Sequence, residues 1–385
     1  MSVDSKVPEI RFEGFGGEWG QDNISNIAPL QRGFDLPKNS IKVGAHPVVM
    51  SNGVNCFHNE FRAKAPGVVT GRSGTIGNIH YIDVDYWPHN TSLWVTNFHK
   101  NVPLFIYYLY VKLDLKRFGT GSGVPTLNRN DVHVQSVALP KDSKEQAAIG
   151  NYFQKLDTLI NQHQQKHDKL SNIKKSMLEK MFPKQGKTIP EIRFKGFTGE
   201  WEEKILNNEV GLFSGLTYSP SDIRKSGTLV LRSSNVKNGQ IIEADNIYVN
   251  PEVVNCSNVV EGDIIVVVRN GSRSLIGKHA QVTSRMNNTV IGAFMTGIRC
   301  KQPAFINALL DTNMFTSEVE KNLGATINQI TNGSFKSMFF MFPTEDEQQE
   351  IGNYFQKLDA LINQHQQQIN KLNNIKQACL SKMFV

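Results

Sequence analysis

The sequence predicts an α+β protein built by duplication, in which two mixed domains alternate with two long helices. The first observation is the length of 385 residues, which exceeds the usual size of a single hydrophobic core. The second is that the segment IGNYFQKLDTLINQHQQ at 149–165 returns as IGNYFQKLDALINQHQQ at 351–367. The third is that short β-rich runs, separated by Asn, Gly, Ser and Pro, fill most of the remaining sequence. The predicted domains are 1–148 and 184–346, and the predicted helices are 149–183 and 347–385.

A second repeat, PEIRFEGFGGEW at 8–19 and PEIRFKGFTGEW at 190–201, marks the start of each half of the chain. Its copies are 182 residues apart, whereas the helical copies are 202 apart, so the second half has gained 20 residues between its repeated segments. We call these repeated segments the frame. Over 149–182 and 351–384 the frame is identical at 25 of 34 positions, while the sequences it encloses align poorly. This contrast predicts that the frame contacts a common partner, or other parts of itself, while the enclosed domains perform different versions of one task.

Both helical copies carry apolar residues at a coiled-coil-like spacing, and no Pro or Gly interrupts either run after Gly150 and Gly352. At 1.5 Å per residue, such a helix would be roughly 50 Å long. The predicted packing positions are Ile149, Phe153, Leu156, Ile160, His163 and Leu170 in the first copy, and Ile351, Phe355, Leu358, Ile362, His365 and Leu372 in the second. One further helix is expected in each domain, at 101–118 and at 302–323.

The equivalent positions of His163 and His365 raise the possibility of a metal site or a pH switch. A second ligand at helical spacing is not shared, because His167 is replaced by Ile369 in the other copy. A polar residue in a helical seam more often sets register. Register or packing is therefore favoured over metal binding, and no metal site is expected.

Charge and composition favour a folded protein with a polyanionic partner. The net charge is +7 and the isoelectric point is near 9.1, which is typical of nucleic-acid binding, although many basic proteins bind no polyanion. The four cysteines are dispersed, which predicts reduced thiols in a cytoplasmic protein. The first residues do not resemble a signal peptide, and no run of about 18 apolar residues predicts a membrane span.

Sequence motifs of catalysis are not found. GTGSG at 119–123 has the glycine spacing of a nucleotide or S-adenosylmethionine loop, but it follows a predicted helix and leads into Val124 and Pro125 instead of opening a helix. The Asp/Asn-Pro-Pro-aromatic tetrapeptide of amino-methyltransferases is absent, as are the GxxxxGK[ST] and HExxH motifs. We therefore expect no enzymatic activity and no cofactor in this chain.

Loops rich in Arg, Gly, Ser and Asn are the candidate binding elements. TGRSGTIGNIHY at 70–81 and VRNGSRSLIGKHAQV at 268–282 occupy comparable places in the two halves, and each follows a predicted strand. Their donors suit phosphates and base edges, whereas a plain surface turn is the alternative for any single Arg. SGVPTLNRNDV at 122–132 and ATINQITNGSF at 325–335 form a second pair, with amide side chains that suit adenine. The candidate DNA-binding residues are Arg72, Ser73, Thr75, Asn128, Arg232, Asn235, Arg269, Asn270, Arg273, Asn328 and Gln329.

Together these features resemble the specificity subunit of Type I restriction-modification systems. The resemblance covers nearly the whole chain. Each variable half is followed by a long helix that is entered through a Pro and a Glu-Gln pair, here Pro140 with Glu145-Gln146 and Pro343 with Glu347-Gln348. GVVTGRSGTIGNIHYIDVDYWPHNTSLWV and GTGSGVPTLNRNDVHVQSVALP also look like the family pattern, whereas the second half has RNGSRSLIGKHAQV and GATINQITNGSF in those places.

The resemblance implies a non-catalytic subunit with two target-recognition domains, separated by two helices that pack as an antiparallel coiled coil around a pseudo-twofold axis. Each domain would read one half of a bipartite, asymmetric site in double-stranded DNA. The helices would set the half-site spacing and dock two methyltransferase subunits, and the full complex would add restriction and translocase subunits. S-adenosylmethionine, ATP and Mg would then be bound by the partners. The alternatives are a stand-alone DNA methyltransferase that uses GTGSG, and a helical scaffold whose variable domains bind protein.

Overall fold

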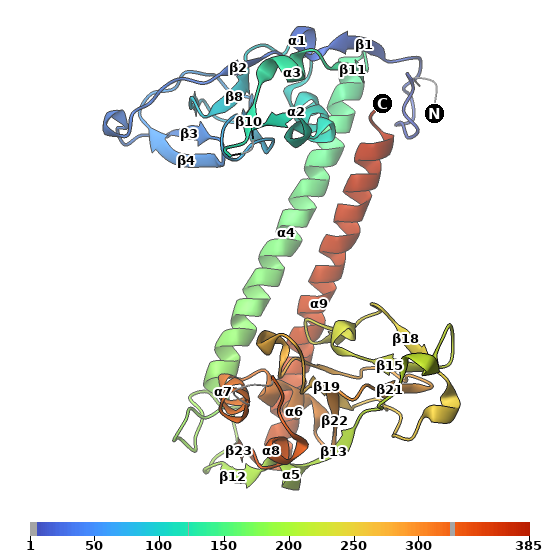
Figure 1. Ribbon diagram of the computed structural model, residues 1–385. Coiled ribbons are helices and arrows are strands. Elements are labelled where there is room, and N and C mark those ends of the chain that lie inside the picture. The colour runs from blue at the N-terminus through green and yellow to red at the C-terminus, as the bar shows by residue number, and fades with distance from the viewer. Residues whose placement is uncertain (1–5, 122, 324–327) are drawn as a thin grey trace. The chain divides into compact units, whose positions relative to one another are not determined.

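The computed structural model describes residues 6–121, 123–323 and 328–385 (Figure 1). The chain divides into two compact units, and each is described by itself. Unit 1 comprises residues 1–164 together with 366–385, and unit 2 comprises residues 165–365. The divisions fall inside the two long helices, α4 (Ser143–Met181) and α9 (Glu345–Lys382). The compact units therefore differ from the predicted domains, because each unit includes one half of each long helix.

Both long helices begin six residues before the repeated segments at 149–165 and 351–367. Helix α4 starts at Ser143, where the carboxylate of Asp142 accepts a hydrogen bond of 2.8 Å from the backbone N–H of Lys144. Helix α9 starts at Glu345, with Asp346 and Glu347 also in its first turn. Acidic groups there stabilise the exposed N–H groups and the positive end of the helix dipole. Two long helices are thus present as predicted, and they span Ser143–Met181 and Glu345–Lys382 instead of 149–183 and 347–385.

Unit 1 contains two small sheets with helix α2 (Pro103–Leu113) against one of them (Figure 1). The first sheet has the order β2-β8-β5-β6, with β2 (Leu30–Arg32), β5 (Gly67–Gly71), β6 (Ile79–Ile82) and β8 (Ser92–Val95). The second has the order β4-β3-β7, with β3 (His46–Met50), β4 (Gly53–His58) and β7 (Trp87–Pro88). The remaining elements are β1 (Gly20–Asn23), α1 (Ile24–Ile27), β9 (Gly119–Thr120), β10 (Thr126–Leu127), α3 (Arg129–His133) and β11 (Ser136–Leu139).

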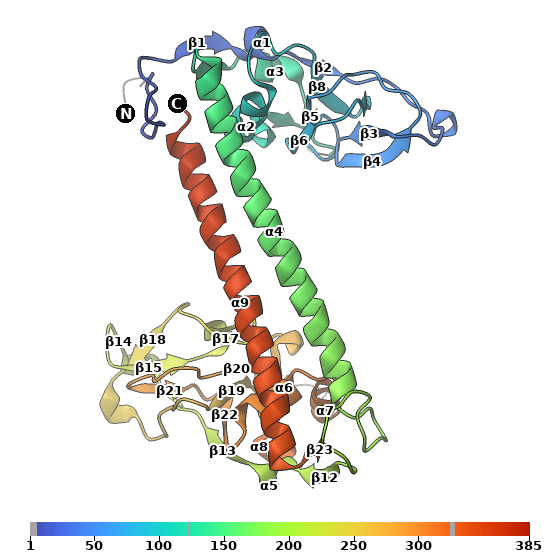
Figure 2. The ribbon, with the colours of Figure 1, turned by 180° about the vertical axis from the view of Figure 1, so that it is seen from behind.

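Unit 2 repeats this plan, with four strands instead of three in its second sheet (Figure 2). One has the order β13-β22-β19-β20, with β13 (Val210–Ser214), β19 (Ile264–Val267), β20 (His279–Gln281) and β22 (Met295–Cys300). The other has the order β14-β18-β15-β21, with β14 (Ile223–Arg224), β15 (Thr228–Leu231), β18 (Ile247–Val249) and β21 (Thr289–Ile291). The remaining elements are β12 (Glu202–Ile205), α5 (Leu206–Glu209), β16 (Val236–Lys237), β17 (Gln240–Ile241), α6 (Pro303–Leu310), α7 (Asn313–Asn322), α8 (Asn332–Lys336) and β23 (Phe339–Phe342).

The expected helix at 302–323 is wrong in one respect, because it forms two helices, α6 and α7. The break lies at Thr312, whose hydroxyl donates to the carbonyl of Leu309 at 2.7 Å and accepts from the N–H of Phe315 at 3.3 Å. A Thr in this position caps a new helix and competes with continuation of the old one. In unit 1 the helix expected at 101–118 ends at Leu113, and a short 3-10 turn covers Leu115–Phe118.

Within each unit the two helix halves run antiparallel. In unit 1 the ammonium of Lys376 binds the carboxylate of Asp157, and the Tyr152 hydroxyl lies 3.5 Å from the sulfur of Cys379. In unit 2 the ammonium of Lys174 lies 2.6 Å from the carboxylate of Asp359. The contacts match 152 with 379 and 157 with 376 in unit 1, and 174 with 359 and 182 with 355 in unit 2, which confirms the antiparallel packing inside each unit.

The predicted packing positions divide into two groups. Those near the start of each helix are buried in the core of their unit, where the tilted rings of Phe153 and Phe384 in unit 1 and of Phe355 and Phe182 in unit 2 have centroid distances of 5.9 and 6.2 Å. This buried group is Ile149, Phe153, Leu156, Ile351, Phe355 and Leu358. The others are only half-buried, namely Ile160, His163, Leu170, Ile362, His365 and Leu372. The apolar pattern therefore reports attachment of each domain to the helices as well as packing of one helix on the other.

Within the residues that the structure describes, no helix is long and apolar enough to span a membrane.

Candidate nucleic-acid interface

A buried Arg–Glu pair ties the beginning of each variable domain to its end. In unit 1 the guanidinium of Arg11 donates from Nε and Nη2 to the two carboxylate oxygens of Glu145, both at 2.7 Å. In unit 2 the guanidinium of Arg193 makes the same bidentate contact with Glu347, both at 2.6 Å. The side chain of Glu145 is 3% exposed and that of Glu347 is fully buried. We call each pair a clamp, because its Arg lies in the frame segment that begins a domain and its Glu lies just before the frame segment that follows the domain.

The glutamine of each Glu-Gln pair holds the same junction. The amide of Gln146 donates to the carbonyl of Pro140 at 2.9 Å, and the amide of Gln348 donates to that of Pro343 at 3.0 Å. The frame segments also meet the helix ends, since the N–H of Ile10 binds the carbonyl of Lys382 in unit 1 and the N–H of Ile192 binds that of Lys180 in unit 2. The repeated frame segments thus contact one another, which is one of the two alternatives that the sequence predicts.

In unit 1 the predicted loops are brought together into one cluster. Ser73 forms an isolated β-bridge with Thr126, the N–H of Gly74 donates to the carbonyl of Pro125 at 3.0 Å, and the N–H of Leu127 donates to that of Arg72 at 2.7 Å. Gly71 allows the 72–75 turn to close beside Ser51, because a Cβ there would lie 1.8 Å from the carbonyl oxygen of Thr75 and 2.6 Å from that of Ser51. We define readout cluster 1 as residues 51–53, 72–75 and 124–128.

Unit 2 assembles its predicted loops through the same backbone contacts. Arg269 forms an isolated bridge with Gln329, the N–H of Asn270 donates to the carbonyl of Asn328 at 3.2 Å, and the N–H of Ile330 donates to that of Val268 at 2.9 Å. The amide of Asn270 also donates to the hydroxyl of Ser233 at 3.0 Å. We define readout cluster 2 as residues 232–235, 268–273 and 328–330.

The contacts show which positions correspond in the two clusters. The N–H groups of Arg72 and Ser73 both donate to the carbonyl of Thr91, at 2.9 and 3.3 Å. Those of Val268 and Arg269 both donate to the carbonyl of Phe294, at 3.0 and 3.2 Å. Ser73 therefore occupies the place of Arg269, and Arg72 that of Val268. The two clusters share a backbone but present Arg at neighbouring positions.

Several predicted amides shape the loops themselves. Asn128 caps helix α3 by accepting from the N–H of Asn130 at 3.1 Å. Asn270 accepts from the N–H of Ser272 at 2.9 Å, and the amide of Asn328 donates to the carbonyl of Gly271 at 3.0 Å. Each of these side chains therefore makes at least one hydrogen bond that orders its own loop.

The DNA-binding prediction for Asn235 needs correction. Its side chain is 0% exposed, and it donates to the carbonyl of Ala244 at 2.8 Å and to the side chain of Asn246 at 3.0 Å. Its oxygen accepts from the backbone N–H of Arg232 at 2.9 Å. A buried amide satisfied in this way is a structural residue, and Asn235 is no longer part of the candidate interface.

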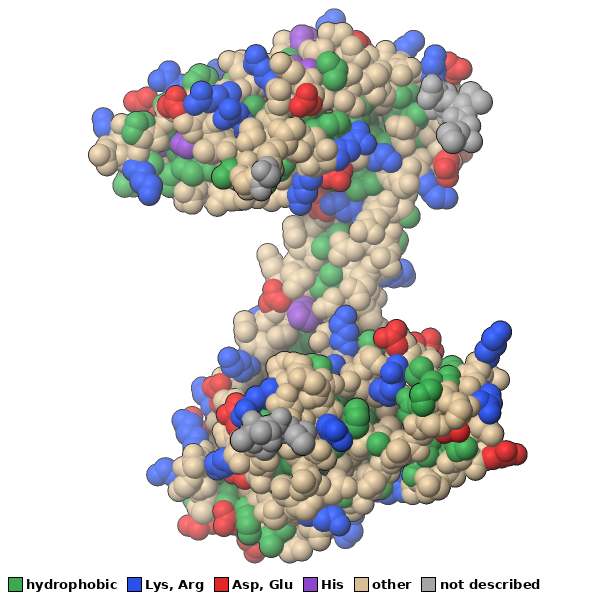
Figure 3. All heavy atoms as spheres, in the orientation of Figure 1, with side chains coloured by type: hydrophobic (Ala, Val, Ile, Leu, Met, Phe, Trp, Pro, Cys, Tyr) green, Lys and Arg blue, Asp and Glu red, His purple; other side chains and the backbone are tan. Residues whose placement is uncertain are grey.

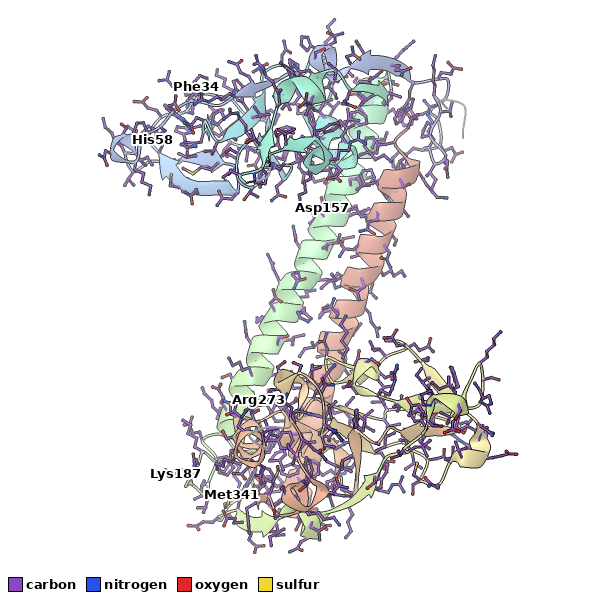
Figure 4. All side chains as sticks on the ribbon, in the orientation of Figure 1. Phe34, His58, Asp157, Lys187, Arg273 and Met341 are labelled. Carbon is purple, nitrogen blue, oxygen red and sulfur yellow. The ribbon has the colours of Figure 1, made fainter. Side chains whose placement is uncertain are left out.

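Arginine and hydroxyl side chains provide the accessible chemistry of the clusters. Thr75, Arg269 and Arg273 are exposed, and Arg273 is labelled in Figure 4. The remaining candidates, Arg72, Ser73, Arg232 and Gln329, are half-buried. The guanidinium of Arg269 stacks 4.8 Å from the centre of the Phe294 ring, which is itself 54% exposed. Arg held flat on an aromatic ring keeps its donors free and loses less entropy on binding.

Charge is not gathered into one large patch. On the face seen in Figure 3, Lys and Arg side chains are interspersed with Asp and Glu over both units. The basic net charge of +7 therefore does not locate an interface by itself. The argument for a site rests on the convergent loops and the residues that they present.

The glycine-rich segment 119–123 does not form a cofactor loop in its described part. Gly119 and Thr120 belong to β9, which pairs antiparallel with β10, so the chain runs from one short strand into another. A phosphate-binding loop would instead lead from a strand into a helix N-terminus. Ser122 lies outside the described residues. Among the residues that are described, no group of three or more His, Cys, Asp or Glu is arranged to hold a metal ion.

Comparison with known proteins gives consistent relatives. The chain is 25% identical over 186 residues to the Type I restriction enzyme StySPI specificity subunit of Salmonella potsdam, covering 46% of this chain and 39% of that protein. It is 25% identical over 173 residues to the EcoKI specificity subunit of Escherichia coli, covering 43% and 36%. These matches span less than half the length of either relative. The MjaVIII specificity subunit of Methanocaldococcus jannaschii is 22% identical over 300 residues, covering 72% and 69%.

A solved structure has the same fold. The S subunit of a Type I restriction-modification system from M. genitalium superposes with a TM-score of 0.69 at 14% sequence identity, covering 98% of this chain and 99% of that one. Residues 17–172 and 199–374 each match the family described as Type I restriction modification DNA specificity domain. These ranges take in most of both units, and the chain belongs to that family.

Proposed function

We propose that this protein is the DNA sequence-specificity subunit of a Type I restriction-modification complex, in which each domain reads one half of a bipartite site in double-stranded DNA. The observation that carries this proposal is the pair of readout clusters, which share backbone contacts but differ in side chains. Equivalent loops with different contents suit one task performed on two different sequences. Because the residues differ, the two half-sites differ and the complete site is asymmetric.

The arginines of the two readout clusters make the direct contacts with bases in this proposal. A guanidinium can donate two hydrogen bonds to the O6 and N7 atoms of guanine in the major groove, which is worth roughly 1–3 kcal/mol of discrimination. Arg72 presents this group in readout cluster 1, and Arg269 and Arg273 present it in readout cluster 2. Ser73, Thr75 and Gln329 supply shorter polar groups, while Arg232 is held by the carbonyl of Asp245.

Comparison of the two copies of the frame helices supports one docked partner copy on each unit. Ten positions of the frame helices are exposed in both copies, and six of these carry the same residue. Folding does not require identity at exposed positions, where most substitutions change stability by about 0.5 kcal/mol or less. In unit 1 the six are Gln154, Lys155, Gln162, Gln367, Lys371 and Asn374, and in unit 2 they are Gln356, Lys357, Gln364, Gln165, Lys169 and Asn172.

Each unit therefore presents one complete copy of the same polar set, assembled from one half of each helix. We call these the frame surfaces. Two copies of one surface suit two copies of one partner, and in this proposal that partner is the methyltransferase subunit. Restriction and translocase subunits would join the larger complex. Catalysis, S-adenosylmethionine, ATP and Mg then belong to those partners, and this chain supplies recognition only.

Substitution of Arg72 and of Arg269 by alanine is expected to affect opposite half-sites. Each variant should lose roughly 5- to 150-fold in affinity for DNA that carries the correct base at its own contact, while discrimination at the other half stays unchanged. The measurement is binding of the complex with methyltransferase subunits to a set of duplexes mutated in one half or the other. Equal loss at both halves in either variant would contradict the two-reader arrangement.

Charge reversal in one frame surface should remove one partner copy. Lys371→Glu alters unit 1 and Lys169→Glu alters the equivalent position of unit 2. Native mass spectrometry is expected to show one methyltransferase subunit lost from each single variant and both lost from the double variant. Lys175→Glu is the matched control, because Lys175 is exposed on α4 but is Gln377 in the other copy. Full occupancy in the double variant would exclude the frame surfaces as docking sites.

The DNA-reading role has its own direct test. Purified chain with methyltransferase subunits should methylate and protect DNA only where both half-sites occur at the correct spacing. A chain that binds S-adenosylmethionine and methylates alone would support the stand-alone enzyme instead. Helix-mediated assembly without any DNA preference would support the protein-binding scaffold.

A further inference from the structure

Next to readout cluster 2 lies a pair of lysines that sequence reasoning did not select. Lys278 precedes strand β20, and Lys237 lies at the end of β16 in the short β16–β17 hairpin. Both strands of that hairpin contact β20, and Figure 2 shows β17 beside it. The topology therefore brings residues 237 and 278 to one edge of unit 2.

The side chain of Lys278 is held against the readout loops. Its ammonium donates to the backbone carbonyl of Ser233 at 3.2 Å, and the hydroxyl of the same Ser233 accepts from Asn270. The backbone of Lys278 is fixed as well, since its carbonyl accepts from the N–H of Val267 at 2.8 Å. The ammonium is therefore an ordered group at the border of readout cluster 2.

The charge of Lys278 is poorly compensated in the chain itself. Burial, and then the positive charge of Lys237, lower the pKa of Lys278. Arg232, which precedes Ser233 in the chain, also lacks an acceptor. Its Nε atom is buried without a hydrogen-bond partner among the described residues. A lysine whose charged form is disfavoured by burial and by a like charge costs stability, and groups perturbed in this way are enriched at binding sites.

Unit 1 differs at the corresponding position. Thr70 pairs with Ile79 in β6, and the equivalent Val266 pairs with His279 in β20, so Asn78 corresponds to Lys278. Asn78 is neutral and exposed. Folding of this sheet edge therefore does not require a cation, and the lysine of unit 2 calls for another explanation.

We propose that Lys237 and Lys278 form a binding site for the DNA backbone, in which the two ammonium groups contact phosphate oxygens flanking the half-site read by unit 2. Phosphate accepts several charge-assisted hydrogen bonds and supplies the missing negative charge. The contact fixes the position of the duplex on readout cluster 2 without reading its sequence. This inference rests on the proposed DNA-reading function and adds a difference between the two units, since unit 1 has no counterpart of Lys278.

The test compares salt dependence of DNA binding for the full chain with its methyltransferase partner. Each phosphate contact contributes roughly 1 to the slope of log affinity against log salt concentration. Lys237→Gln with Lys278→Gln is expected to make that slope less negative by about 2, with unchanged discrimination between correct and altered half-sites. The control is Lys195→Gln, which makes the same substitution at one exposed lysine of the frame and should leave the slope unaltered.

Two further variants separate a binding role from a folding role. Lys278→Arg keeps the charge and should keep the slope, whereas Lys278→Gln alone should reduce its magnitude by about 1. Because neutralisation relieves repulsion from Lys237, the melting temperature of Lys278→Gln should not fall.

An unchanged slope in the double variant would overturn the phosphate site while leaving the DNA-reading function intact. A lost base preference in the unit 2 half-site would also overturn it, because the lysines would then read bases. Absence of any sequence preference in the unaltered complex would instead refute the proposed function.

Discussion

Replacement of Arg193 by methionine is expected to destabilise unit 2 by roughly 3–5 kcal/mol. The clamp partner Glu347 is fully buried, and both of its oxygens accept from this one guanidinium. Removal of Arg193 leaves a carboxylate without compensation in an apolar environment, which costs more than the net value of the ion pair itself. The double variant Arg193→Met with Glu347→Met should recover most of the loss, because it removes the buried charge as well.

Urea unfolding measures this effect directly. Trp201 is the tryptophan of unit 2 and is 2% exposed, so its fluorescence reports the unfolding of that unit once Trp19, Trp87 and Trp94 are changed to phenylalanine. Lys301→Gln is the control, since the side chains of its pair with Glu345 are 85% and 69% exposed. Its loss should be about 1 kcal/mol or less. A similarly small loss for Arg193→Met would show that the clamp does not hold the domain to its helix.

Leu358→Lys should destabilise unit 2 by at least about 3 kcal/mol. The Leu358 side chain is 8% exposed and belongs to the main core of the unit, so lysine there loses apolar contacts and places a charge among them. Leu361 lies one turn further along α9 and is 44% exposed.

Leu361→Lys is therefore a matched control, with the same substitution on the same helix and an expected change of about 0.5 kcal/mol or less. The same tryptophan signal follows both variants. Equal losses at residues 358 and 361 would mean that helix propensity, and not attachment to the domain core, determines stability. A large loss at residue 358 alone supports the observed division of the packing positions into core and half-buried groups.

The frame helices were predictable because a strong apolar period and a second copy reinforced each other. Their early starts depend on capping groups such as Asp142, which lie outside the repeated letters. The break at Thr312 gave no comparable signal, because neither Pro nor Gly interrupts 304–323 and a single hydroxyl makes the cap. Short-range competition of this kind is decided by local geometry, which residue type alone does not specify.

The candidate site was predictable at the level of loops and less so at the level of residues. Residue type identified the segments that converge, yet it did not align them residue by residue, whereas the backbone contacts match Arg72 with Val268 and Ser73 with Arg269. An alignment without a shared motif does not reveal a shift by one position. Asn235 shows a second limit of residue type. An Asn near a turn can contact a base or can be buried as a structural residue, and only its surroundings distinguish the two roles.

The clamps were missed because their members are far apart, at separations of 134 and 154 residues. A signal was nevertheless present. Arg11 and Arg193 recur in one frame segment, and Glu145 and Glu347 recur just before the other, so the four residues repeat together while the sequence between them changes. Repetition within one chain therefore identified the residues, although it did not show that they contact each other.

The clamps also determine how such a protein can evolve. The two separations differ by 20 residues, yet both clamps close with the same bidentate geometry. A domain of altered length and sequence is therefore accommodated if it begins after one frame segment and returns to the next. Under the proposed function, a new DNA specificity can then arise by exchange of a whole domain between genes, without the passage through unstable intermediates that stepwise substitution of a packed core would require.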